Sequence, residues 1–78
     1  MTRLSVASDV MCSVGYDSST AVLRVEFRNG SVYEYIDVPR HHYDALLAAP
    51  SKGRYFNACL RGTFPYHRLA GWRSAPGA

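Results

Sequence analysis

The sequence predicts an α+β domain: a three-stranded antiparallel β-meander followed by two short helices packed on one face of the sheet. Three observations predict it. The first half of the chain alternates apolar and polar residues around a hairpin turn. The second half carries apolar residues at helical spacing. The 78 residues, 47% of them hydrophobic and 19% charged, suit one small folded core and are too few for two.

The three predicted strands are residues 10–16, 21–28 and 31–38. The first is a short apolar run that ends in Asp17-Ser18-Ser19, a sequence typical of turns. The second alternates apolar with charged side chains, as a half-buried strand does. The third follows directly after the hairpin turn and returns along the second.

The hairpin loop at Asn29-Gly30 sets the register of the second and third strands. This dipeptide is typical of a two-residue type I′ turn, in which both central residues have positive φ. Such a loop pairs Arg24 with Tyr35 and Glu26 with Tyr33, and so places both tyrosines on the polar face of the hairpin. A one-residue bulge would exchange the faces on one strand, so the assignment is conditional on a regular hairpin.

Two short helices are expected after the sheet. Pro39 suits the first helical position of one helix, and Pro50 stops it. Ser51 is a natural N-cap for the other, and Gly62 is placed to end it. The second helix carries one apolar stripe, formed by Tyr55, Phe56, Cys59 and Leu60.

The C-terminal part of the chain is expected to be less regular. Residues 64–69 predict a short fourth extended segment that packs back on the core. Residues 70–78 are rich in Gly, Ala, Ser and Pro and predict a flexible tail. A single domain is therefore expected over residues 1–69.

Charge is unevenly distributed along the chain. Residues 1–37 hold three basic and five acidic side chains, whereas residues 38–78 hold six basic and one acidic. The net charge of +3 therefore comes from the second half. A basic half favours a polyanionic partner, although a solvated basic face without a partner explains the same counts.

The N-terminus lacks the apolar segment of a secretory signal peptide, and no apolar run approaches the ~20 residues that span a bilayer. We therefore expect a cytoplasmic protein without a membrane partner. In that compartment Cys12 and Cys59 are expected to be reduced thiols rather than a disulfide.

Several motifs between residues 6 and 69 agree in order and spacing with one known family. They are Val14-Gly15-Tyr16-Asp17, Leu23-Arg24-Val25-Glu26-Phe27-Arg28-Asn29-Gly30, Val32-Tyr33-Glu34-Tyr35, Asp37-Val38-Pro39 and Ala49-Pro50-Ser51-Lys52-Gly53-Arg54-Tyr55-Phe56-Asn57. The sequence thus resembles the KTSC domain, found at the C-terminus of some lysyl-tRNA synthetases and as a free-standing small bacterial protein. The resemblance implies a free-standing member and, through the synthetase context, an RNA partner.

Tyr33 and Tyr35 are the first candidate site. Two tyrosines on one sheet face, flanked by Arg24 and Arg28, would stack unpaired bases while the guanidinium groups meet phosphates. The structural alternative is that one tyrosine packs under a helix and that Arg24 and Tyr35 form an ordinary cross-strand pair. Both interpretations stay open at this point.

The second candidate is the basic segment Ser51, Lys52, Gly53 and Arg54. It opens a helix, where an anion is favoured, and Arg61 lies about two turns further along the same face. Arg68 adds a further phosphate contact. The structural alternative is an N-cap with solvated basic neighbours, in which Gly53 relieves a tight helix crossing.

Catalytic and metal-binding chemistry are not indicated. His41 and His42 are neighbours about 100° apart on a helix and do not form a metal-binding pair. No nucleophile and base occur at a known spacing, and no cofactor is implied. The sequence therefore predicts a non-catalytic module that binds RNA, either tRNA or a single strand. The alternative is a protein-interaction module or homodimer that uses a sheet edge or the tyrosine face.

Overall fold

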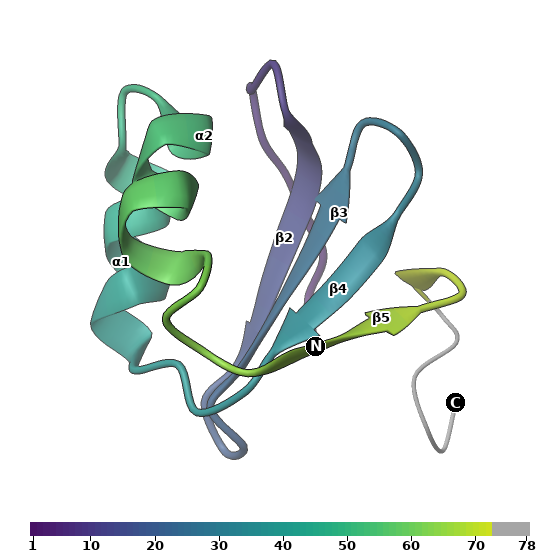
Figure 1. The fold of residues 1–78 in the computed structure, drawn as a ribbon, viewed down its shortest axis with the longest axis vertical. Coiled ribbons are helices and arrows are strands. Elements are labelled where there is room, and N and C mark those ends of the chain that lie inside the picture. Colours follow the sequence, from purple (N-terminus) through teal and green to yellow (C-terminus); the bar gives the residue numbers. More distant parts are fainter. Residues whose placement is uncertain (73–78) are drawn as a thin grey trace.

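The computed structural model describes residues 1–72 as one five-stranded antiparallel sheet with two helices against one face (Figure 1). The strand order is β1-β2-β3-β4-β5. The strands are β1 (Leu4–Ser5), β2 (Met11–Asp17), β3 (Val22–Phe27), β4 (Val32–Tyr35) and β5 (Tyr66–Leu69). The helices are α1 (Arg40–Ala48) and α2 (Lys52–Tyr55), which continues as a π-helical turn, η1 (Phe56–Leu60).

The predicted α+β class is confirmed, with five strands in place of three. The extended segment expected near residues 64–69 is β5, which pairs with β4. Strand β1 was not predicted, because a two-residue strand carries no alternation in its sequence. Within residues 1–72, no helix has the length and apolar character that crossing a membrane requires.

The predicted two-residue turn is wrong. The Phe27 N–H donates to the Ser31 carbonyl at 2.8 Å and the Gly30 N–H donates to the Phe27 carbonyl at 3.0 Å. The loop therefore has three residues, and Gly30 alone takes the left-handed conformation, with φ of 91°. The extra residue shifts the register by one, so that Arg24 lies opposite Glu34 and Val25 opposite Tyr33.

This register reverses the predicted faces of β4. Tyr33 and Tyr35 lie on the helix side of the sheet with the apolar residues of β3, and Glu34 lies on the other face with Arg24. The physical reason is that two tyrosine rings bury far more apolar surface under the helices than one glutamate would. The longer loop exchanges the faces of β4, and β3 and β4 pair without a register shift of their own.

The hydrophobic core lies between the sheet and the helices. Its fully buried members include Val14, Leu23, Val25, Leu46 and Leu60. Ser51 caps α2 as predicted, and its hydroxyl accepts from the Arg54 N–H at 3.3 Å. Pro39 is the N-cap of α1 rather than its first helical residue, with an extended ψ of 145°.

The segment after β5 is described as far as Trp72. Its backbone carbonyl accepts a hydrogen bond of 2.7 Å from Arg24 Nη1. The predicted tail, residues 70–78, lies outside the described residues from residue 73 onward, and the domain boundary at residue 69 stays a prediction. Cys12 and Cys59 are free thiols, each half-buried.

Candidate nucleic-acid interface

Five aromatic rings form a closed cycle between the sheet and η1. Each ring contacts the next, with centroid separations of 5.3 to 5.8 Å, and four of the five contacts are edge-to-face. The members of this aromatic cluster are Phe27, Tyr33, Tyr66, Tyr35 and Phe56, in the order of the cycle. Strands β3, β4 and β5 and the π-helical turn thus each contribute at least one ring.

The aromatic cluster lines a cavity of about 540 Å³, which we call the aromatic cavity. Tyr66 is 61% exposed and Tyr33 is half-buried, so both rings are accessible to a ligand. Tyr35 is only 5% exposed and lies beneath them. Burial raises the pKa of Tyr35 to about 12, and the neighbouring Tyr66 and Tyr33 act in the same direction.

A second cavity of about 690 Å³ adjoins the first and shares Val10 and Asn57 with it. We call it the basic cavity, because three of its lining residues are basic and only Asp9 is acidic. The basic residues are Arg28, Lys52 and Arg54. A Cβ on Gly53 would lie 3.0 Å from Val10 Cγ2. The absence of a side chain at Gly53 therefore lets Val10 pack closely against α2.

The basic side chains around the two cavities are not used in ion pairs. Among residues 1–72, ion pairs join Arg3 to Glu26, Arg24 to Glu34, Arg40 to Asp44 and His67 to Glu34. The described acidic side chains make no such pair with the remaining cations, which are Arg28, Lys52, Arg54, Arg61 and Arg68. Arg61 lines the aromatic cavity, and Arg68 lies opposite Tyr33 in the β4–β5 ladder. The four arginines are exposed, whereas Lys52 is half-buried and its Nζ donates to the Ala49 carbonyl at 3.2 Å. Arg28 Nε donates to the Ser8 carbonyl at 2.6 Å.

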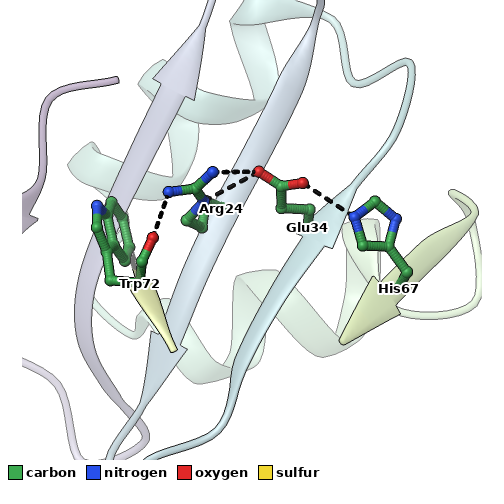
Figure 2. Close-up of polar contacts among 4 residues, drawn as sticks. All are labelled: Arg24, Glu34, His67 and Trp72. Atoms are coloured by element: carbon green, nitrogen blue, oxygen red, sulfur yellow. Dashed lines mark hydrogen bonds and ion pairs between the residues drawn. The ribbon is translucent and has the colours of Figure 1, made fainter. Parts of the chain in front are cut away.

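Arg24 lies on the opposite face of the sheet (Figure 2). Its Nε and Nη2 donate to Glu34 Oε2 at 2.9 and 2.6 Å. His67 Nε2 contacts the other carboxylate oxygen at 2.9 Å. The predicted placement of Arg24 beside Tyr35 is wrong, because the three-residue loop pairs Arg24 with Glu34 instead.

The Trp72 ring completes this opposite face. It lies 5.1 Å from the Arg24 guanidinium carbon and 5.4 Å from that of Arg3, measured to the ring centroid. Gly15 leaves room for it: a Cβ there would meet Trp72 Cζ2 at 3.0 Å and the Thr2 carbonyl oxygen at 2.7 Å. Side chains of the chain itself therefore cover the Arg24–Glu34 pair on this face, and the two cavities described above lie on the helix side.

Residues 7–64 of this chain match the sequence model of the KTSC domain family. The chain belongs to this family. A KTSC domain protein from Yersinia pestis, solved by crystallography, superposes with a TM-score of 0.85 at 32% sequence identity, over 87% of this chain and 96% of that one.

Two kinds of relative carry the KTSC domain. A lysine–tRNA ligase of Trichormus variabilis is 47% identical over 55 residues, which are 70% of this chain. This chain spans about a tenth of the length of the ligases it matches. A small protein of Stutzerimonas stutzeri is 44% identical over 61 residues and is covered to 86% of its length, so free-standing KTSC domains exist as well.

The structure of this KTSC domain brings most of the predicted site residues together. Tyr33, Tyr35 and Arg61 line the aromatic cavity. The segment from Ser51 to Arg54 lines the basic cavity. Arg68 lies on the same side and Arg24 does not.

Sequence reasoning missed four residues that line the cavities: Tyr66, Phe27, Phe56 and Asn57. Tyr66 is the most exposed aromatic residue of the cluster, and it meets Tyr35 only because β5 pairs with β4. The sequence carried no signal of that pairing. Among residues 1–72, no group of three or more His, Cys, Asp or Glu side chains is placed to hold a metal ion.

Proposed function

We propose that this KTSC domain is a non-catalytic module that binds single-stranded RNA. Bases enter the aromatic cavity, and phosphates contact the basic side chains around both cavities. The observation that carries the proposal is the adjacency of the two cavities, one lined by five aromatic residues and the other by three cations with no acidic partner among residues 1–72. Stacking platforms beside a positively charged groove are the usual means of binding a single strand.

Each part of the site supplies a different term of the affinity. Tyr66 and Tyr33 present accessible ring surface, and base stacking on such rings contributes about 1–3 kcal/mol per base. Tyr35 supports the two rings from below rather than stacking. Lys52, Arg54, Arg61 and Arg68 release counterions when they meet phosphates, so the affinity is expected to fall steeply with salt.

Similarity to lysine–tRNA ligases supports RNA as the polyanion. The matched segments belong to proteins whose name gives tRNA as a substrate, and they retain 39 to 47% identity with this chain. A tRNA also presents single-stranded loops and a single-stranded end, which are the parts of an RNA that aromatic side chains reach. RNA as the proposed ligand thus agrees with the occurrence of related domains in lysine–tRNA ligases.

The proposal is tested by fluorescence anisotropy with a labelled tRNA and a labelled RNA single strand, each at low and near-physiological salt. The double variant Lys52→Glu, Arg54→Glu is expected to weaken binding to both RNAs and to lower the slope of log affinity against log salt by about 1 per lost phosphate contact. Arg40→Glu is the control for charge reversal outside the site, because Arg40 is exposed and lines neither cavity, although it reverses one charge where the double variant reverses two.

A second variant tests the aromatic part. Tyr66→Ser is expected to weaken binding of the single strand about 5- to 150-fold while the salt slope stays unchanged. Wild-type affinity in both the charge-reversal variant and Tyr66→Ser would overturn the proposal. So would the absence of binding to either RNA at low salt.

The position of β5 at the edge of the sheet supports one other function, the binding of a protein partner. It is an edge strand with three exposed residues, Tyr66, His67 and Arg68, and its outer backbone groups can pair with an added strand. Light scattering after size-exclusion chromatography tests the homodimeric form. A monomer at high protein concentration would exclude that form.

A further inference from the structure

Strand β5 is an open edge of the sheet, with β4 as its one neighbour (Figure 1). The Ile36 N–H donates to the Pro65 carbonyl at 2.8 Å, so the Pro65 backbone faces β4. Backbone groups alternate in direction along an antiparallel strand, so His67 also faces β4, whereas the N–H and C=O groups of Tyr66 and Arg68 face outward. No turn, loop or cap within residues 1–72 bonds these four outward groups.

The side chains of Tyr66 and Arg68 complement each other. Tyr66 is 61% exposed and lies on the helix side of the sheet, where its ring contacts those of Tyr33 and Tyr35. Arg68 is exposed on the same side and makes no ion pair with the acidic side chains among residues 1–72. A ring and an unpaired guanidinium two residues apart on one face are self-complementary, because an antiparallel copy of the strand sets each opposite the other.

We infer that β5 pairs with β5 of a second copy of this chain, antiparallel and centred on His67. In this register Tyr66 of each copy lies opposite Arg68 of the other. Both of these pairs are hydrogen-bonded pairs with two bonds each, so every outward backbone group of the two residues is satisfied. Two cation–π contacts form on the helix side of the joined sheet.

The neighbouring registers satisfy fewer groups. Centring the pairing on Arg68 sets the two guanidinium groups opposite each other, and like charges directly opposite destabilise a sheet. Centring it on Tyr66 sets Arg68 opposite Phe64, which lies outside β5. Pairing of β5 with β1 of another copy is head-to-tail and leaves edges open, and β1 offers only two residues.

The pairing brings a residue of each copy to the site of the other. Its two-fold axis is perpendicular to the sheet, so the helices and aromatic cavities of both copies lie on one side of a continuous sheet. Arg68 of each copy lies beside Tyr66 of the other, at the rim of the aromatic cavity. On the opposite face the two His67 side chains meet, and each keeps its own Glu34 as a partner (Figure 2). RNA is not needed for the pairing, so the protein alone is measured.

Sedimentation velocity over a protein series from about 10 μM to about 1 mM tests the pairing, a range that suits a small interface. Arg68→Pro removes an outward N–H and the guanidinium but no ladder bond to β4. We expect wild type to dimerise within this range and Arg68→Pro to raise the dissociation constant of the dimer about tenfold or more.

Ser5→Pro is the matched control at the other edge of the sheet. The Val6 N–H donates to the Cys12 carbonyl at 3.0 Å, so the Val6 backbone faces β2 and the Ser5 N–H faces outward. Ser5→Pro therefore also removes one outward N–H from an exposed edge residue. We expect it to dimerise as wild type does.

His67→Cys tests the register. Residues opposite each other in a non-hydrogen-bonded pair have Cα atoms about 4.5 Å apart, so oxidation is expected to join two copies of this variant by a disulfide. Arg68→Cys is the control, because its two Cα atoms would lie about 8 Å apart, which is too far for a disulfide. Non-reducing electrophoresis compares both variants with wild type, which shows the background from Cys12 and Cys59. Thermal unfolding checks that each variant is folded.

Three results would overturn the pairing. They are a wild type that stays monomeric at the highest concentration, a dimer that Ser5→Pro weakens as much as Arg68→Pro does, and equal cross-linking of the two cysteine variants. Each of them leaves RNA binding in place, because no RNA is present. Failure of RNA to bind would in turn leave the pairing in place. A dimer that Arg68→Pro alone weakens, with cross-linking confined to His67→Cys, establishes β5 as the interface.

Discussion

The Arg24 guanidinium and the Glu34 carboxylate face each other across β3 and β4, joined by hydrogen bonds of 2.9 and 2.6 Å. Arg24 is 7% exposed and Glu34 is 8% exposed. Two buried charges are tolerated because the guanidinium and the carboxylate neutralise and hydrogen-bond each other. Arg24 also donates to the Trp72 carbonyl, and Glu34 also contacts His67 (Figure 2). This pair holds the face opposite the cavities closed.

Removing the carboxylate of this pair is expected to destabilise the fold strongly. Glu34→Ala leaves Arg24 buried without its counter-charge, which costs about 3–5 kcal/mol of unfolding free energy. Asp44→Ala is the control, because it breaks an exposed pair with Arg40 and is expected to cost less than about 1 kcal/mol. Urea denaturation measures both. Similar losses in the two variants would contradict a buried, mutually satisfied pair.

Gly15 is expected to determine the position of Trp72. In Gly15→Ala the new Cβ would lie 2.7 Å from the Thr2 carbonyl oxygen and 3.0 Å from Trp72 Cζ2, so the backbone at Thr2 has to shift and the indole is displaced slightly from its position between Arg3 and Arg24. Trp72 is the only tryptophan of the chain, so its fluorescence emission reports the change as a shift to longer wavelength.

Gly53→Ala is the control for this shift. Its Cβ would meet only the Val10 side chain, at 3.0 Å, and Gly53 lies on α2 rather than beside Trp72. We expect the emission of this variant to match that of wild type. Unchanged emission in Gly15→Ala would show that Trp72 does not depend on the missing side chain of residue 15.

The stability of the domain is expected to fall at high pH through Tyr35. Burial raises the pKa of this hydroxyl from 10.0 to about 12 in the folded state. The folded state therefore favours the neutral form. Its contribution to stability is complete below about pH 10 and is lost as the pH rises toward 12.

Tyr35→Phe checks this pH dependence, because phenylalanine has no hydroxyl to ionise. Free energies of unfolding measured along a pH series are expected to decline less in this variant than in wild type above about pH 10. Tyrosinate absorbance measured on the folded protein is expected to lose its latest-titrating component in the same variant. A wild-type titration in which every tyrosine ionises near 10 would refute the raised pKa.

Gly30 is expected to be the position of the hairpin loop most sensitive to substitution. It is the one loop residue with positive φ, at 91°, so Gly30→Ala is expected to cost about 1 kcal/mol of unfolding free energy. Gly30→Asn is expected to cost less, because asparagine tolerates this conformation better than alanine. Thermal unfolding compares the two variants, and equal stability of Gly30→Ala and wild type would speak against the three-residue loop.

The sequence by itself determined most of the elements of this protein and their order, with the two-residue strand β1 as an exception. The alternation of β3, the turn dipeptide, the Ser51 N-cap and the two prolines around α1 are local signals, and local backbone preferences decide them. The family could also be predicted from the sequence, because the motifs of the KTSC domain occur in the expected order within the matched residues 7–64. The basic candidate segment was found for the same reason, since its residues are contiguous.

Tertiary structure alone decided the faces and the site. One extra loop residue moved Tyr33 and Tyr35 to the helix side and Glu34 beside Arg24, and both registers are compatible with the local sequence. The aromatic cavity needs β5 to deliver Tyr66 and η1 to deliver Phe56 across the sheet. Such contacts join residues far apart in the chain, and their free energy comes from the burial of rings that no single segment buries on its own.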